Sequence, residues 1–306
     1  MKIESRAKFN YRYAKSHCFI IEQVITPISP HLLDRINHCA RVWRLEIEYT
    51  FETETSAIAF VSRGGQALVL KLIKREGDEW YAGEVLEAFD GRGVVRVYEY
   101  DAGAMLIERL EPGNSLVEMV LSGKDEEATG VLAGVTQQHS PREIPTRCPT
   151  VQDWGRGFDR YLATGDNQIP TELVESGKSV FFNLSASQRN PRLLHGDLQH
   201  YNVLFDSERG WVAIDPKGVV GETEYEIGAV FRNPIERPEL FLSTLTIEKR
   251  LRQFETQLNL NYERMLAWTF AQAVLSAIWS IEDGYEVDAM NPALRLAQLL
   301  RPMAGS

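Results

Sequence analysis

Cysteine is scarce in this chain. The three cysteines, Cys18, Cys39 and Cys148, are far apart and form no Cys-x-x-Cys pair. An odd number at such spacing does not fit a disulfide framework, a zinc site or a dithiol redox site. We expect three reduced thiols that serve as packing residues in a cytoplasmic protein.

Long hydrophobic runs are also absent. The N-terminal segment MKIESRAKFNYRYAK carries charges and is followed only by the short apolar run CFII, so we expect no signal peptide. The most apolar segment, residues 267–281, is shorter than a bilayer span and includes Thr269, Gln272 and Ser276. This segment predicts a buried helix, and we expect no membrane partner.

Basic residues are outnumbered by acidic ones. The 33 Lys and Arg residues against 43 Asp and Glu residues give a net charge of −10, which argues against nucleic acid as a partner. The same charge suits a cationic ligand, or it serves solubility alone. With 44% hydrophobic and 25% charged residues, the 306-residue chain has the composition of a soluble globular protein, long enough for two domains or one two-lobed enzyme.

The chain contains no internal repeat, and its two parts differ in pattern. The first part favours a Gly64–Gly65 hairpin turn, one helix over 78–89, and strands over 42–47, 56–61, 67–72, 94–100 and 104–110. Helical patterns follow Pro112–Gly113, except for a strand-loop-strand region over 193–215, and the longest helix is expected between Asn261 and Gly284. We predict an α+β fold, with a sheet-rich part over 1–110, where the role of 1–40 stays open, and a mainly helical part over 111–306.

The segments LLHGDLQHYNVLFD (193–206) and WVAIDPKG (211–218) carry the strongest chemical signal. They place Asp197 and Asn202 on a loop between apolar strands, and Asp215 at the end of a further strand. A carboxylate beside an incoming hydroxyl, with oxygen ligands for magnesium nearby, is what phosphoryl transfer needs. Two alternatives are a turn satisfied by His195 and Asp197, or a hydrolase-type metal cluster of these two with His200, but neither uses Asn202.

Together with GRGVVRVYE, VLK, MLIERL, IDPKGVVGETEYEIGAVFRNP and SAIWSIEDG, these segments resemble the aminoglycoside phosphotransferase family, in the branch of the streptomycin and hydroxyurea kinases. The resemblance covers roughly residues 40 to 285. It implies a bilobal protein-kinase-like fold, in which a small antiparallel-sheet lobe with one helix binds ATP, or another nucleoside triphosphate, with Mg²⁺. A larger, mainly helical lobe would carry the catalytic loop and the site for a small-molecule acceptor.

The resemblance also implies roles for single residues. Asp197 would be the catalytic base, Asn202 and Asp215 would hold the metal, and Lys71 would bind the nucleotide's α and β phosphates. The acidic partner of Lys71 would be Glu79, because Ala82 occupies the position where relatives carry a glutamate; Glu84 is the alternative.

Further site residues are implied less directly. Amides near Ser56 would contact phosphates, although the hairpin there has no Gly-x-Gly-x-x-Gly, and the main chain from Glu108 to Leu110 would pair with the adenine edge. His195 and Glu226 would order the catalytic loop. The residues Trp279, Glu282 and Asp283 would hold cationic groups of the acceptor, or else Trp279 packs in the core and the two acids are solvated.

The expected function is ATP- and magnesium-dependent phosphorylation of a hydroxyl on a streptomycin-like aminoglycoside, which inactivates the antibiotic. A kinase of hydroxyurea or of another small metabolite is the alternative. A non-catalytic nucleotide-binding scaffold is a third possibility, but Lys71, Asp197, Asn202 and Asp215 are all present. No long segment ending in Ala-Pro-Glu follows Asp215, which disfavours a protein kinase.

Overall fold

The computed structural model describes residues 28–304, which form two compact units. The first unit contains the described residues up to Glu118, together with Val135–Arg147 and Tyr201–Lys217. The second contains Met119–Gly134, Cys148–His200 and the described residues from Gly218 onward. Both units are thus discontinuous in sequence, whereas the sequence analysis divides the chain once, between residues 110 and 111.

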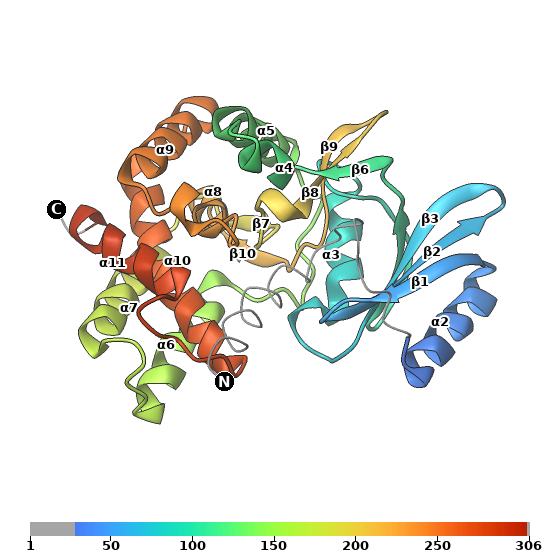
Figure 1. The fold of residues 1–306 in the computed structure, drawn as a ribbon, viewed down its shortest axis with the longest axis horizontal. Coiled ribbons are helices and arrows are strands. Elements are labelled where there is room, and N and C mark those ends of the chain that lie inside the picture. Colours follow the sequence, from blue (N-terminus) through green and yellow to red (C-terminus); the bar gives the residue numbers. More distant parts are fainter. Residues whose placement is uncertain (1–27, 305–306) are drawn as a thin grey trace, which may run out of the picture. The chain divides into compact units, whose positions relative to one another are not determined.

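An antiparallel sheet of five strands, in the order β1-β2-β3-β5-β4, forms the frame of the first unit (Figure 1). The strands are β1 (Glu46–Glu52), β2 (Ser56–Arg63), β3 (Gln66–Ile73), β4 (Val97–Asp101) and β5 (Ala104–Glu108). A short 3-10 helix, η2 (Asp78–Tyr81), leads into α3 (Ala82–Phe89) between β3 and β4. These elements confirm the predicted antiparallel sheet and the helix that follows its third strand.

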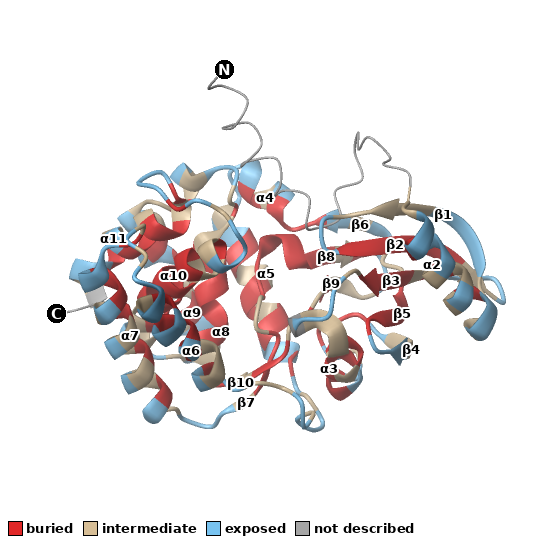
Figure 2. Ribbon diagram, turned by 90° about the horizontal axis from the view of Figure 1, so that it is seen from below, coloured by how far each residue is buried: buried red, intermediate tan, exposed pale blue. Residues whose placement is uncertain are grey.

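A further helix, α2 (Pro30–Trp43), precedes the sheet and was missed by the sequence analysis. Leu32 and Ile36 of α2 are buried in the core with strand residues, and Cys39 and Trp43 pack against this core at helical spacing. The strand expected over 42–47 is therefore wrong at its start: the helix runs to Trp43 and β1 begins at Glu46. Figure 2 shows β2 and β3 coloured as buried, with helix α2 next to the sheet.

The alternation of side chains along β3 decides where Lys71 lies. Leu70 and Leu72 belong to the core on which α2 packs, so Lys71 between them projects from the opposite face of the sheet. Its cross-strand neighbours are Ile58 on β2 and Met105 on β5. The helix α2 and the Lys71 ammonium group thus lie on opposite faces.

A three-stranded antiparallel sheet brings a distant part of the chain into the first unit. Its order is β6-β8-β9, with β6 (Pro112–Ser115), β8 (Val203–Asp206) and β9 (Gly210–Ala213). The backbone of Ala213 is bonded on both sides, since its N–H donates to Gly93 O and its carbonyl accepts from Val95 N–H, each at 2.9 Å. This anchoring fixes the start of the segment that carries Asp215.

The second unit is mainly helical, with a short antiparallel pair of strands, β7 (Arg192–Leu194) and β10 (Val219–Gly221). The helix α10 begins after the predicted N-cap Asn261, whose side chain accepts from Arg264 N–H at 2.8 Å. Among the described helices, α10 alone is long and apolar enough to cross a membrane, and most of it is buried in this unit, as Figure 2 also shows. The helices are α4 (Val117–Leu121), α5 (Asp125–Gln138), α6 (Val151–Thr164), α7 (Thr171–Ala186), α8 (Thr223–Glu226), α9 (Thr244–Leu258), α10 (Tyr262–Glu282) and α11 (Pro292–Ala304). The 3-10 turns are η3 (His200–Asn202), η4 (Ile227–Arg232) and η5 (Pro238–Leu240), and α4, α5 and η3 contribute residues to both units.

Candidate active site

Lys71 lies between two carboxylates of the first unit. Its Nζ is 2.8 Å from Asp215 Oδ1 and 3.4 Å from Glu79 Oε2, and the Lys71 side chain is only 7% exposed. Burial lowers the pKa of Lys71, but the charges of Asp215 and then Glu79 outweigh that effect and raise it above its ordinary value. The ammonium group is therefore charged and held in place, as a phosphate-binding lysine requires.

The structure assigns the acidic partner of Lys71 to Glu79 rather than Glu84. Glu79 sits in η2, one turn before α3, and reaches the ammonium group directly. Glu84 lies in the first turn of α3 and is 3.8 Å from the guanidinium of Arg147 instead. The distances to Lys71 thus favour Glu79, the first of the two partners that the sequence left open.

Asn202 and Asp215 belong to the first unit and lie on segments joined by a backbone hydrogen bond. Ile214 N–H donates to Asn202 O at 2.9 Å, and the Asn202 side chain is fully buried. Asp215 has a φ of +58°, in the left-handed region that few residues other than glycine adopt. Such strained backbone is typical of functional positions, and the neighbouring bonds of Ala213 and Ile214 hold it.

This donor set fits a magnesium ion. A carboxylate and a side-chain amide oxygen are hard oxygen ligands, and magnesium in nucleotide sites takes few protein ligands beside phosphate oxygens. Asp215 and Asn202 would hold the ion, which supplies positive charge that neutralises the phosphate oxygens during transfer. Across residues 28–304, no group of three or more His, Cys, Asp or Glu side chains is arranged to hold a metal, so the hydrolase-type cluster has no support.

Asp197 belongs to the second unit, on the loop that follows β7. Glu226, at the end of α8, holds this loop through two hydrogen bonds. Its two carboxylate oxygens accept from His195 N–H at 2.7 Å and from Gly196 N–H at 2.9 Å. His195 is fully buried, and its Nδ1 accepts from Asp197 N–H at 3.3 Å. Both residues predicted to order this loop therefore contact its backbone.

Burial raises the pKa of Glu226 to about 7, against the opposing effect of the Gly196 and His195 amides and the positive charge of Arg192. The carboxyl group is thus poised between its two charge states near neutral pH. The ionised form accepts more strongly from the two amides than the protonated form, whose hydroxyl oxygen also donates.

The short helix α8 is anchored by a second buried glutamate that the sequence analysis missed. Glu222, fully buried, accepts from the indole N–H of Trp268 and from the guanidinium of Arg264. It also accepts from Arg189 N–H at 2.9 Å. Glu222 and Glu226 therefore fix the two ends of the same turn, and the run Gly221-Glu222 at the head of the family-like segment was the available signal.

A tryptophan of the second unit packs against the loop of Asp197, and a second tryptophan packs against the first. The ring of Trp154 on α6 packs against Gly196: a Cβ atom there, in a backbone with φ of +83°, would stand 2.9 Å from the indole. Trp279 on α10 meets Trp154 edge-on, with ring centroids 5.7 Å apart, and both rings are partly exposed. Glu282 pairs with Arg160 at 2.9 Å, while Asp283 caps the exposed end of α10. Of the three residues proposed for the acceptor, Trp279 is the one that this contact links to the catalytic loop.

The remaining predicted nucleotide contacts lie at the turns and edges of the first unit. Ser56 is buried at the start of β2, and its N–H donates to Thr53 Oγ1 at 3.0 Å, so this amide is engaged within the turn. Glu108 ends β5; its carboxylate accepts from Arg96 N–H at 2.6 Å and pairs with Arg209. Leu110 follows the strand.

The fold and these side chains together define a phosphotransferase with a kinase-like fold. A solved structure of a thermostable mutant of aminoglycoside phosphotransferase APH(4)-Ia, in a ternary complex with ADP and hygromycin B, matches the chain with a TM-score of 0.65 at 17% identity. The match covers 88% of this chain and 99% of that one. It confirms the predicted fold class.

Comparison with sequence families then identifies the chain more closely. A model of the aminoglycoside/hydroxyurea antibiotic resistance kinases matches residues 43–284, and the chain belongs to this family. It is 35% identical to streptomycin 3''-kinase of Klebsiella pneumoniae, over 76% of this chain and 86% of that protein. It is 29% identical to hydroxyurea phosphotransferase of Kitasatospora aureofaciens, over 79% of this chain and 74% of that protein.

Proposed function

We propose that this kinase transfers the γ-phosphoryl group of ATP, bound with magnesium, to a hydroxyl of a streptomycin-like aminoglycoside and thereby inactivates it. The observation that carries the proposal is the buried pair of Lys71 with Asp215, on the same unit as Asn202. The similarity to a streptomycin 3''-kinase supports the choice of acceptor. Because the reaction consumes ATP, we place it in the cytoplasm.

Each residue has a separate task in the proposed reaction. Lys71 binds and aligns the phosphates, and Glu79 fixes the ammonium group on one side. Asp197 orients the acceptor hydroxyl and accepts its proton. The acceptor oxygen forms a bond to the γ-phosphorus, the bond from that phosphorus to the β,γ-bridging oxygen breaks, and ADP leaves.

Asp197 and Asn202 belong to different units but lie on one short stretch of the chain. Only five positions separate Asp197 from Asn202, so an extended chain between them spans less than about 18 Å. The proposed base and one proposed metal ligand thus stand in one short segment of the sequence. Glu226 and His195 restrict this loop from the side of Asp197.

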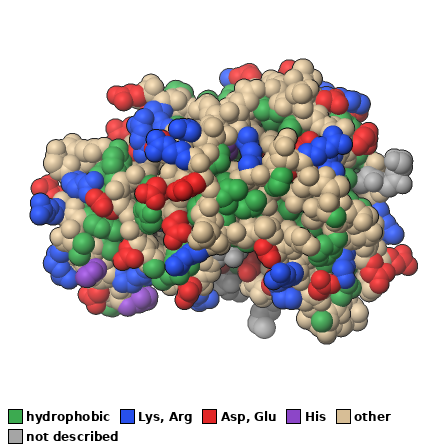
Figure 3. Space-filling model, turned by 180° about the vertical axis from the view of Figure 1, so that it is seen from behind, with side chains coloured by type: hydrophobic (Ala, Val, Ile, Leu, Met, Phe, Trp, Pro, Cys, Tyr) green, Lys and Arg blue, Asp and Glu red, His purple; other side chains and the backbone are tan. Residues whose placement is uncertain are grey.

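A cationic acceptor suits the surroundings of Asp197. Trp154, which is partly exposed, packs against Gly196, and the partly exposed Trp279 packs edge-on against Trp154. An indole face attracts ammonium and guanidinium groups. The net charge of −10 favours the approach of a cation, and acidic and basic side chains are intermingled on the face drawn in Figure 3. Streptomycin-like aminoglycosides carry such cationic groups together with hydroxyls.

The test is a phosphorylation assay with purified protein, ATP and magnesium. Streptomycin should gain the mass of one phosphoryl group, and one ADP should form for each product molecule. Hydroxyurea is tested in parallel, because the similarity to a hydroxyurea phosphotransferase suggests it as the alternative acceptor. Phosphorylation of hydroxyurea with none of streptomycin would refute the proposed acceptor and leave the phosphotransferase chemistry intact.

A further inference from the structure

Helix α2 lies almost entirely before residue 43, where the match to the kinase family begins, yet one of its side chains reaches the nucleotide-binding part. The Arg35 guanidinium donates to Ile73 O at 2.8 Å and to Gly103 O at 3.1 Å. Ile73 ends β3, two residues after Lys71, and Gly103 lies in the turn between β4 and β5. Arg35 therefore bridges the ends of two strands from the sheet face opposite Lys71.

The same guanidinium also contacts the element that carries Glu79. Its carbon lies 5.6 Å from the centre of the Trp80 ring, in the geometry of a cation–π contact. Trp80 O accepts from Gly103 N–H at 2.9 Å, which ties η2 to the turn that Arg35 holds. Trp80 and Glu79 are neighbours in η2, so the position of one constrains the other.

Close packing makes this arrangement specific. The Trp80 ring lies directly on Gly103, where a Cβ atom would stand 2.5 Å from the indole. Gly103 O also accepts from Ile73 N–H at 2.9 Å, so one carbonyl joins the end of β3 to the turn and to Arg35. A shift of this junction would move η2, and with it the carboxylate of Glu79.

We propose that Arg35 is a positioning residue for nucleotide binding: it fixes the junction of Ile73, Gly103 and Trp80 and thereby keeps Glu79 opposite Lys71. Arg35 does not touch the reacting groups. Its effect passes through Glu79, which restrains the ammonium group that aligns the phosphates. The inference rests on the nucleotide-binding half of the proposed function and is independent of the acceptor.

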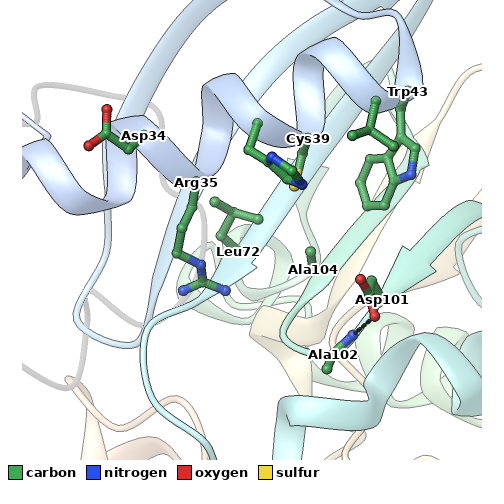
Figure 4. A pocket seen from close by; sticks show the side chains of 10 residues that line it. Asp34, Arg35, Cys39, Trp43, Leu72, Asp101, Ala102 and Ala104 are labelled. Carbon is green, nitrogen blue, oxygen red and sulfur yellow. Dashed lines mark hydrogen bonds between the residues drawn. The ribbon is translucent and has the colours of Figure 1, made fainter.

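The surroundings of Arg35 make it suitable for mutation. Figure 4 shows Arg35, Cys39 and Trp43 extending from α2 beside Leu72 and Ala104, where they line a cavity of about 350 Å³. Truncation of Arg35 enlarges an existing cavity, and it leaves the buried residues of α2, Leu32, Ile36 and Ala40, in place. We therefore expect Arg35→Ala to fold.

The first measurement uses the protein without nucleotide. Arg35→Ala should speed the hydrogen exchange of the amides of Gly103 and Trp80, which donate to Trp80 O and Gly77 O. Arg41→Ala is the matched control, since Arg41 is an exposed arginine of the same helix. It should leave these amides unchanged. Equal exchange in wild type and Arg35→Ala would overturn the proposal.

The second measurement is a double-mutant cycle on ADP and ATP affinity by calorimetry. Arg35→Ala and Glu79→Gln should each weaken nucleotide binding, by about tenfold, and the double variant should bind no more weakly than Glu79→Gln alone. Additive losses, or unchanged affinity in Arg35→Ala, would show that Arg35 does not act through Glu79. If Arg35→Ala does not fold, Arg35→Lys is measured in the same cycle, because a lysine keeps the charge but lacks the planar guanidinium that donates to both carbonyls.

The outcome separates this inference from the proposed acceptor. If the wild-type protein binds nucleotide but leaves streptomycin unmodified, the proposed acceptor is refuted. The double-mutant cycle still tests the role of Arg35 in that case. If the wild-type protein phosphorylates streptomycin and the losses in the cycle are additive, the proposed function is supported and the proposed role of Arg35 is refuted.

Discussion

Asp197 and Asp215 are both aspartates of the family-like segments, but the structure surrounds them differently. The Asp215 carboxylate is paired with Lys71, on a backbone of positive φ. Asp197 lies on a loop whose amides are bonded to Glu226 and His195, and its charge raises the pKa of Tyr225, after the larger effect of burial. Substitution of the two residues should therefore affect different steps.

Asp197→Asn should lower kcat by about a hundredfold, or roughly 3 kcal/mol of transition-state stabilisation, because it removes the carboxylate that we propose orients and deprotonates the acceptor. The side chain keeps its size, and nucleotide affinity should hardly change. Single-turnover kinetics with streptomycin and calorimetry with ATP measure the two quantities. Near-native turnover in Asp197→Asn would remove Asp197 from the catalytic role.

The burial of Glu226 should make the unfolding free energy depend on pH, and the raised pKa gives the sign of that dependence. Its pKa rises from 4.5 in the unfolded chain to about 7 in the folded protein, so folding favours the protonated form. The resulting stability is fully present below pH 4.5 and is lost as pH rises to about 7, by about 3 kcal/mol. Glu226→Gln cannot ionise, so the difference in unfolding free energy between wild type and this variant should fall across that window.

Urea denaturation at a series of pH values measures this difference. Glu224→Gln is the control, because Glu224 lies on the same turn and is partly exposed. A flat difference between wild type and Glu226→Gln from pH 4.5 to 7 would contradict the raised pKa.

At the scale of elements, the helices and strands that follow from alternation or local motifs could be predicted from the sequence. Features that depend on contacts between distant residues could not. The strands around the Gly64–Gly65 turn and the N-cap Asn261 follow from local pattern, and both were confirmed. Helix α2 was missed although its apolar residues recur at helical spacing, and its last two residues, Val42 and Trp43, were assigned to the start of a strand. The contact of Trp154 with Gly196 joins residues far apart in sequence, so no local pattern could indicate it.

The helices α6 and α10 supply the proposed acceptor surface through Trp154 and Trp279. Trp279→Ala should raise KM for streptomycin several-fold while KM for ATP stays constant, because loss of a partly exposed cation–π contact is worth about 1 kcal/mol. Trp279→Phe retains an aromatic ring and should recover part of the affinity. Steady-state kinetics with each substrate varied in turn measure the effect. An equal rise in both KM values would indicate a structural role for Trp279.

At the scale of the whole molecule, the class of enzyme was predictable because the chemical residues stand in short segments of fixed order. Asp197, Asn202 and Asp215 lie within twenty residues of one another, and the family match confirms the kinase assignment. The division into compact units was not predictable, because Tyr201–Lys217 joins the first unit through strand pairing with β6. The choice between Glu79 and Glu84 likewise needed the observed distance to Lys71.

Bound nucleotide should stabilise the whole molecule against unfolding, and the size of this stabilisation should depend on the metal site. A ligand at a hundred times its Kd adds about 2.7 kcal/mol to the unfolding free energy, which raises the Tm of a chain of this size by several degrees. ATP with magnesium should therefore raise Tm more than ATP with a chelator. Asp215→Ala should lose most of that difference, since it removes the proposed charged metal ligand, whereas Glu248→Ala, which removes an exposed carboxylate of α9, should retain it. Scanning calorimetry of the three proteins gives the comparison, and a magnesium-dependent shift that survives in Asp215→Ala would exclude Asp215 as a metal ligand.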